Sequence, residues 1–69
     1  MYRFHNVKIR REDVEKAEKI LAMHDEIGDI DRINVEVGPD AISYWIAPYI
    51  YEDFETIKDE FKQAGIQII

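Results

Sequence analysis

Three basic side chains lie just before or at the start of the first expected helix: Lys8, Arg10 and Arg11. The N-terminus of a helix carries unpaired backbone N–H groups and the positive end of the helix dipole, so it favours anions and disfavours nearby cations. Cations at this place indicate a negative partner, either a bound phosphate or carboxylate or an acid of the chain itself. Asp40 lies in a turn expected at the same end of the fold and can supply that charge. The sequence leaves both alternatives open.

The other reactive side chains do not form a recognisable catalytic set. The chain has no cysteine, which excludes a thiol nucleophile, a disulfide framework and a cysteine-based zinc knuckle. His5 and His24 are far apart in sequence, and His24 falls near the end of an amphipathic helix, where a solvated or capping role is ordinary. Ser43 and Thr56 carry the only aliphatic hydroxyl groups, and no glycine-rich phosphate loop is present. We therefore expect no enzyme, no metal site and no cofactor.

A β-hairpin is the clearest element that could position these residues. Residues 33–37 alternate apolar and polar side chains, and residues 42–46 are rich in β-forming types. Residues 38–41 are expected to form the turn between them, because Gly38, Pro39 and Asp40 are typical turn residues. A connection of even length fixes the register and places the apolar members of both arms on one face beneath the helices. The pairs expected are Val37 with Ile42, Val35 with Tyr44, and Ile33 with Ile46.

This register directs Trp45 to the uncovered face, with Asn34 opposite and Ser43 and Ala47 beside it. Tryptophan and tyrosine are enriched at binding hot spots because they bury a large rigid surface at little entropic cost. The alternative is that Trp45 only shields the sheet.

The C-terminal segment also lacks charged side chains that would deter strand pairing at an edge. The interface candidates are Trp45, Asn34, Ala47, Tyr49, Tyr51, Gln67 and Ile69.

Two amphipathic helices are expected, one before and one after the hairpin in the sequence. The first runs from residue 11 to about residue 24, and Gly28 is expected as its left-handed cap. The second runs from about residue 51 to residue 64 and stops at Gly65. Their apolar stripes are Val14, Ala17, Ile20 and Leu21 in the first, and Phe54, Ile57, Phe61 and Ala64 in the second.

Short strands are expected at both ends, over residues 2–9 and 66–69, so the order of elements is βαββαβ. With right-handed crossovers this order predicts a single α+β domain over residues 1–69, with a four-stranded antiparallel sheet in the order 4-1-3-2 and both helices on one face. That arrangement resembles the ferredoxin-like fold. The buried face of the first strand stays unassigned, because Tyr2 and Phe4 have one parity and Val7 and Ile9 the other. The strand is therefore expected either to bulge near residues 5–6 or to end early.

The run from Gly28 to Val37 is similar to the loop and second strand of small heavy-metal-binding and ACT-type modules. The ACT-type resemblance implies a sensor for a small ligand. The paired cysteines of the metal modules have no counterpart here. If Tyr2 and Phe4 face outward, they approach Trp45, and open-face aromatic residues are how RNA-recognition modules stack bases. Neither the glycine-aromatic signature of that family nor its basic surroundings are present in the sequence.

Charge and composition limit the classes of partner that the chain is expected to bind. The chain has 69 residues and a net charge of −6, with +4 in residues 1–11 and −10 in the remainder. This balance argues against binding to a nucleic-acid backbone, which needs a basic footprint, and leaves an acidic surface for a basic partner. No apolar run approaches the roughly 20 residues of a membrane span, and no signal peptide precedes the strand pattern at Tyr2. We expect a cytoplasmic protein that does not enter a membrane.

Two classes of function follow from these patterns. The first is a small protein-interaction or regulatory module that binds itself or a basic partner through its open sheet face or a sheet edge. An acidic inhibitor of a nucleic-acid-binding protein is one form of it. The second is an ACT-like sensor that holds a small ligand or anion at the basic loop near Arg10 and Arg11.

Overall fold

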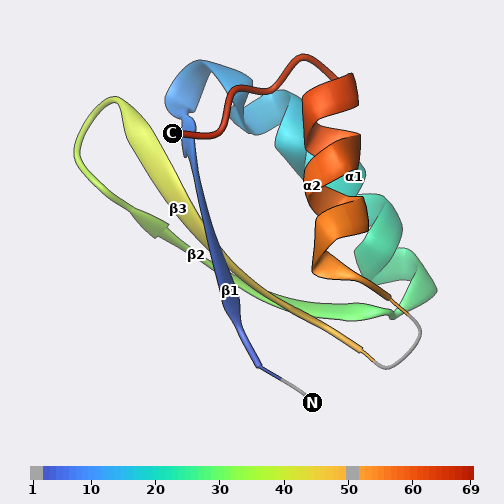
Figure 1. Cartoon of the computed structure of the whole chain (residues 1–69). Helices are drawn as coiled ribbons and strands as arrows, with labels where there is room; N and C mark the ends of the chain where they lie inside the picture. Colours follow the sequence, from blue (N-terminus) through green and yellow to red (C-terminus); the bar gives the residue numbers. More distant parts are fainter. Residues whose placement is uncertain (1–2, 50–51) are drawn as a thin grey trace.

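The computed structural model describes residues 3–49 and 52–69 and shows an antiparallel sheet with two helices packed on one face (Figure 1). The elements are β1 (His5–Arg10), the 3-10 helix η1 (Arg11–Asp13), α1 (Val14–Ile27), β2 (Ile30–Glu36), β3 (Ala41–Pro48) and α2 (Phe54–Gln63). The strand order is β1-β3-β2, so β3 is central and pairs with both neighbours. Tyr2 and Tyr51 lie outside the described residues.

The core lies between the helices and one face of the sheet. Val7 and Ile9 of β1 are buried there, whereas Phe4 is exposed, which settles the face of the first strand. The strand pairs with β3 in one unbroken register from His5 to Arg10, so it contains no bulge and begins later than predicted. The remaining core members are Ala17, Leu21, Ile30, Ile42, Tyr44, Ile46, Ile57, Phe61 and Ile66.

Both helices form close to where the apolar periodicity predicts them. Residues 11–13 adopt a 3-10 turn before α1, and Gly28 ends α1 at a φ of 81°, which confirms the expected left-handed cap. Its N–H donates to His24 O at 2.8 Å. The start of α2 is capped by Asp53, whose side chain accepts a hydrogen bond from Glu55 N–H at 3.1 Å.

The predicted fourth strand is wrong. Residues 66–69 do run beside β1, but among the described residues they form an isolated bridge between Ile68 and Ile9 and one hydrogen bond from Ile69 N–H to Lys8 O at 2.8 Å. A continuing ladder would direct Gln67 N–H to the backbone of β1. That N–H donates instead to Asp13 Oδ2 at 3.3 Å. The described residues therefore form a small α+β fold with a three-stranded sheet, and the four-stranded ferredoxin-like sandwich is not present.

The predicted hairpin register is also wrong by one residue. Ile33 lies opposite Trp45, Asn34 opposite Tyr44, and Val35 opposite Ser43. Val37 N–H bonds to Ala41 O at 3.2 Å, which leaves an odd connection over residues 38–40. Ile42, Tyr44 and Ile46 are buried under the helices as predicted, whereas Ile33, Val35 and Val37 are exposed.

The reason for the shifted register is the environment of Arg32. Its side chain points to the helices, where it donates to Glu18 Oε2 and to Asp25 Oδ2, each at 2.9 Å. Tyr44 Oη donates to the same Glu18 oxygen at 2.7 Å. These charge-assisted bonds supply the partners that a polar residue needs beneath a helix. Successive residues of a strand face opposite sides of the sheet. Because Arg32 faces the helices, Ile33 faces the uncovered side.

Candidate functional site

The uncovered face of the sheet carries a group of exposed apolar side chains. Trp45 of β3 is 42% exposed, Ile33 opposite it is 54% exposed, and Val35 on the same face is 50% exposed. Strand alternation places Phe4, which immediately precedes β1, and Tyr49, which follows β3, on this side, and both are exposed. We call this group the open-face patch: Phe4, Ile33, Val35, Trp45 and Tyr49.

Two opposite charges flank Trp45 along a diagonal of this face. Lys8 of β1 lies opposite Ser43, two residues before Trp45 on the central strand. Asp31 of β2 lies opposite Ala47, two residues after it. Tyr49 Oη donates to Asp31 Oδ1 at 2.6 Å, and this hydrogen bond raises the pKa of Tyr49 above its usual range. The tyrosine therefore stays protonated and anchors the acidic corner of the face.

The structure brings together only some of the predicted interface candidates. Trp45 and Tyr49 lie on the open face, but Ala47 is fully buried. Asn34 is exposed on the helix-facing side of β2, because the register places Ile33 rather than Asn34 opposite Trp45. Gln67 and Ile69 lie in the segment beside β1, away from Trp45 on the central strand. Phe4, Ile33 and Val35 were not predicted as interface residues.

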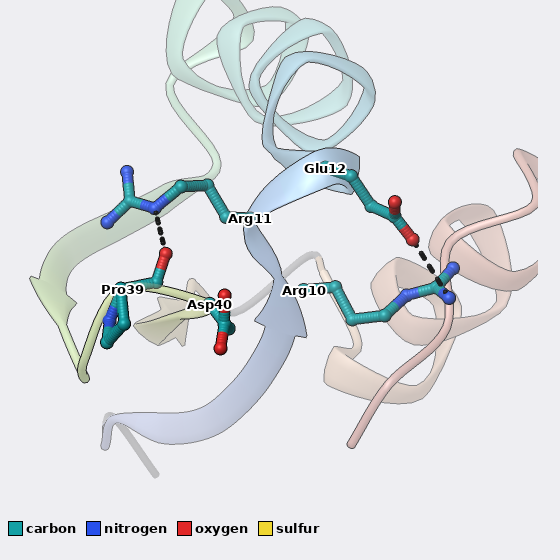
Figure 2. A pocket seen from close by; sticks show the side chains of 5 residues that line it. All are labelled: Arg10, Arg11, Glu12, Pro39 and Asp40. Carbon is teal, nitrogen blue, oxygen red and sulfur yellow. Dashed lines mark hydrogen bonds and ion pairs between the residues drawn. The ribbon is translucent and has the colours of Figure 1, made fainter.

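The basic loop and the hairpin turn meet, as the sequence predicts, and they line a shallow pocket of about 490 Å³ (Figure 2). Arg11 N–H donates to Asp40 O at 2.9 Å, and Arg11 Nε donates to Pro39 O at 2.8 Å. Lys8 is not among the residues that line this pocket; it lies opposite Ser43, on the open face of the sheet. Only two of the three anion-binding candidates therefore line this pocket.

Acids of the chain itself neutralise Arg10. Its guanidinium lies 3.0 Å from Glu12 Oε1 and 3.1 Å from Asp13 Oδ2 (Figure 2 draws the first pair). Burial alone would raise the pKa of Asp13, but the Gln67 N–H and the Arg10 guanidinium hold it below its ordinary value. Asp13 therefore stays ionised and joins η1, β1 and the C-terminal segment.

A second group of polar side chains converges on His24 near the end of α1. The imidazole is almost fully buried, with 4% of its surface exposed. Nδ1 lies 3.0 Å from Asp29 Oδ1 and 3.4 Å from Glu52 Oε2, and Nε2 lies 2.6 Å from Glu60 Oε1. We call these four residues the His24 cluster. The solvated role expected for His24 is wrong.

The His24 cluster favours a positive charge at its centre. Burial by itself favours the neutral imidazole, but the hydrogen bonds and negative charges of Glu60 and Asp29 outweigh burial and raise the pKa of His24 above its ordinary value. In the absence of another cation, the ring carries a proton on both nitrogens over a widened pH range. The proton on Nδ1 then faces Asp29 and Glu52.

Sequence reasoning missed this cluster because its members are spread over three segments of the chain. The local signal was Asp29, which follows the Gly28 cap and is turned back toward the last turn of α1. Glu52 and Glu60 reach the same place only through the packing of α2 against α1, and no short motif encodes that contact.

No family model matches the chain, and neither a curated protein nor a solved structure matches it. Within residues 3–49 and 52–69, neither helix is long and apolar enough to cross a membrane.

Proposed function

We propose that this chain is a small protein-interaction module that self-associates through its open-face patch. The observation that carries the proposal is the register of β2, which sets Ile33 and Val35 beside Trp45 on a face that no described helix covers. Contiguous exposed apolar side chains on a small domain mark interaction sites, because removing them from water is favourable by about 25 cal/mol per Å².

Charge placement favours a second copy of the chain as the partner. Lys8 and Asp31 lie on opposite sides of Trp45, each two positions away along the central strand and on different flanking strands. A twofold axis that passes over Trp45, perpendicular to the Lys8–Asp31 diagonal, sets each lysine over the aspartate of the other copy. The same patch then serves both copies, as an isologous interface requires.

Size supports the same proposal. A chain of about 60 to 70 residues buries only about 60% of its unfolded surface, so its core is thin. The described sheet is covered by helices on one face, and a second copy would cover the other. The basic loop supports the alternative ligand sensor less well, because Arg10 is paired with Glu12 and Asp13, and Arg11 is bonded to Pro39 O.

Sedimentation velocity on matched variants tests the proposal. We expect a species of twice the 8.2 kDa chain mass for the unmodified protein. Ile33→Glu places a charge in the centre of the patch, opposite Trp45, and should give a monomer. Met23→Glu adds the same charge at an exposed site of α1 and should leave the dimer intact. A monomeric unmodified protein up to about 1 mM, where binding is worth only about 4 kcal/mol, would contradict the proposal.

A further inference from the structure

The His24 cluster has the donor atoms and spacing of a metal site. Donor atoms of His24, Asp29 and Glu52 all lie within 4.8 Å of one another. The distances from Nδ1 are 3.0 Å to Asp29 and 3.4 Å to Glu52. Ligands that share a metal at about 2.1 Å lie about 3 to 4 Å apart, so one ion fits between these atoms with small side-chain adjustments.

The second ring nitrogen is held in the manner of a metal-bound histidine. Glu60 Oε1 lies 2.6 Å from Nε2, so Nε2 keeps its hydrogen as a donor and Nδ1 is the nitrogen that can give its lone pair to an ion. A carboxylate on the far nitrogen fixes the tautomer and ring orientation of most metal-binding histidines and raises their basicity. Glu60 therefore has the position of a supporting residue rather than a ligand.

The His24 cluster carries more negative than positive charge. Three carboxylates surround one imidazole, so the group keeps a net charge of −2 even when the ring is protonated. Among the ion pairs of residues 3–49 and 52–69, none joins a lysine or arginine to these carboxylates. Asp29 and Glu52 are largely buried, at 19% and 14% side-chain exposure, and buried charge without a counterion is costly.

Backbone hydrogen bonds hold the ligand-bearing segments in place. Asp29 N–H donates to His24 O at 3.3 Å, which keeps the carboxylate beside the last turn of α1. Tyr49 N–H donates to Asp29 O at 2.8 Å, and Glu52 N–H donates to Tyr49 O at 3.0 Å. This chain of bonds ties the segment before α2 to the segment after α1. The donor atoms are therefore positioned before any ion arrives.

We propose that His24 Nδ1, Asp29 and Glu52 bind one divalent transition-metal ion of the Zn²⁺ class, with Glu60 orienting the imidazole. Binding replaces the Nδ1 proton with the metal and releases that proton to solvent. One imidazole with two carboxylates selects a transition metal over Mg²⁺, which prefers oxygen ligands alone. The partly exposed carboxylate edges leave room for water to complete the coordination.

Titration of the metal-free protein with ZnCl₂ by isothermal calorimetry tests this site. We expect one ion per chain, and a loss of affinity of at least tenfold in Asp29→Asn and in Glu52→Gln. Glu60→Gln should cost about 10- to 100-fold, as removal of a residue that orients a ligand does. Glu26→Gln removes a carboxylate from an exposed site of α1 outside the cluster and should bind like the unmodified protein. Circular dichroism checks that each variant is folded.

Nitrogen NMR of the two histidines gives a readout that does not depend on affinity. Zn²⁺ should move the Nδ1 resonance of His24 and leave His5, which stacks on Phe54, unchanged. The same titration in the Ile33→Glu variant separates this proposal from self-association, because the patch and the cluster share no residue. Absence of saturable Zn²⁺ binding, equal binding by all four carboxylate variants, or Mg²⁺ binding as tight as Zn²⁺ would overturn the metal site.

Discussion

Trp45 lies on the open face of β3 with its indole half exposed, whereas the residues on either side of it in that strand are buried. Truncating it should weaken association without disturbing the core. We expect Trp45→Ala to raise the dissociation constant of the dimer about 30-fold or more, since loss of a hot-spot side chain costs about 2 kcal/mol or more. Met23→Ala, at an exposed site of α1, is the matched control in sedimentation equilibrium.

A Trp45→Ala variant that associates as tightly as the unmodified chain would show that the open face is not the interface. Urea unfolding of both variants in the monomeric Ile33→Glu background separates association from stability. The free energies of unfolding there should agree within about 0.5 kcal/mol, the usual range for surface substitutions.

Glu18 is the residue whose ionisation couples β2 and β3 to α1. Burial would raise its pKa, but hydrogen bonds from Arg32 and Tyr44 and the charge of Arg32 hold the pKa below its ordinary value. A carboxyl with a lowered pKa in the folded state contributes stability that is present above the unfolded pKa, about 4.3 for a glutamate. That stability is lost as the pH falls through the folded value.

We therefore expect Glu18→Gln to reduce the free energy of unfolding at pH 7 by about 1 kcal/mol, the upper range for a pair that is partly exposed to water. The difference from the unmodified protein should shrink as the pH falls below about 4. Urea unfolding from pH 7 to pH 3 measures it, with Glu15→Gln at an exposed site of the same helix as control. A difference that stays constant over this range would refute the role given to Glu18.

At the scale of elements, the sequence predicts both helices, the hairpin and the strand before α1. Periodicity of apolar residues is enough for these, and Gly28 marks the end of α1 as expected. The periodicity of apolar residues does not predict the register of the hairpin. Alternation in residues 33–37 shows that one face of β2 is apolar, but not which face meets the helices. Arg32 decides it through Glu18 and Asp25, which belong to a different element.

The prediction of a fourth strand was wrong for a related reason. Residues 66–69 have β-forming side chains and lie beside β1, so the pattern and the position agree with a strand. The ladder is interrupted because Asp13 accepts the N–H of Gln67. The open-face patch could be predicted only in part for the same reason, since Trp45 was placed by strand alternation whereas Ile33 and Val35 needed the true register.

Arg32 should be costly to remove if it fixes the face of β2. We expect Arg32→Met to lower the free energy of unfolding by about 1 to 2 kcal/mol, less than the roughly 3 to 5 kcal/mol of a fully buried pair. The lower figure applies because Glu18 and Asp25 keep about 40% of their side-chain surface in water and can be rehydrated.

Urea unfolding measures this loss, with Arg3→Met at an exposed site as control. Adding Glu18→Gln to Arg32→Met should cost less than the sum of the two single changes, because they act on the same contact. Strict additivity of the two changes would contradict the account of the register.

For the molecule as a whole, the structure shows where charges of opposite sign lie on the open face. The basic N-terminal residues contribute Lys8 to one corner of the open face, and Asp31 occupies the diagonal corner. The open-face patch and the His24 cluster share no side chain, although the backbone of Tyr49 bonds to both Asp29 and Glu52. Substitutions at Ile33 and at Glu60 therefore test the proposed interface and the proposed metal site separately.

Reversal of these two charges tests the twofold arrangement. Lys8→Glu alone and Asp31→Lys alone should each weaken the dimer about three- to tenfold through like charges set against each other. Combined in one chain, they restore opposite charges across the interface and should recover most of the affinity. Sedimentation equilibrium at low and high salt measures both effects, which salt should reduce. A double variant as weak as the product of the two single effects would contradict the proposed axis.

The most direct test of the proposed self-association is an isotope-filtered NOE experiment on a mixture of labelled and unlabelled chains. It detects only contacts between two different copies. If the chain self-associates through the open-face patch, we expect intermolecular contacts between the Trp45 indole of one copy and the methyl groups of Ile33 and Val35 of the other. Intermolecular contacts confined to the helices or to residues 66–69, or none at concentrations where the dimer is expected, would contradict it.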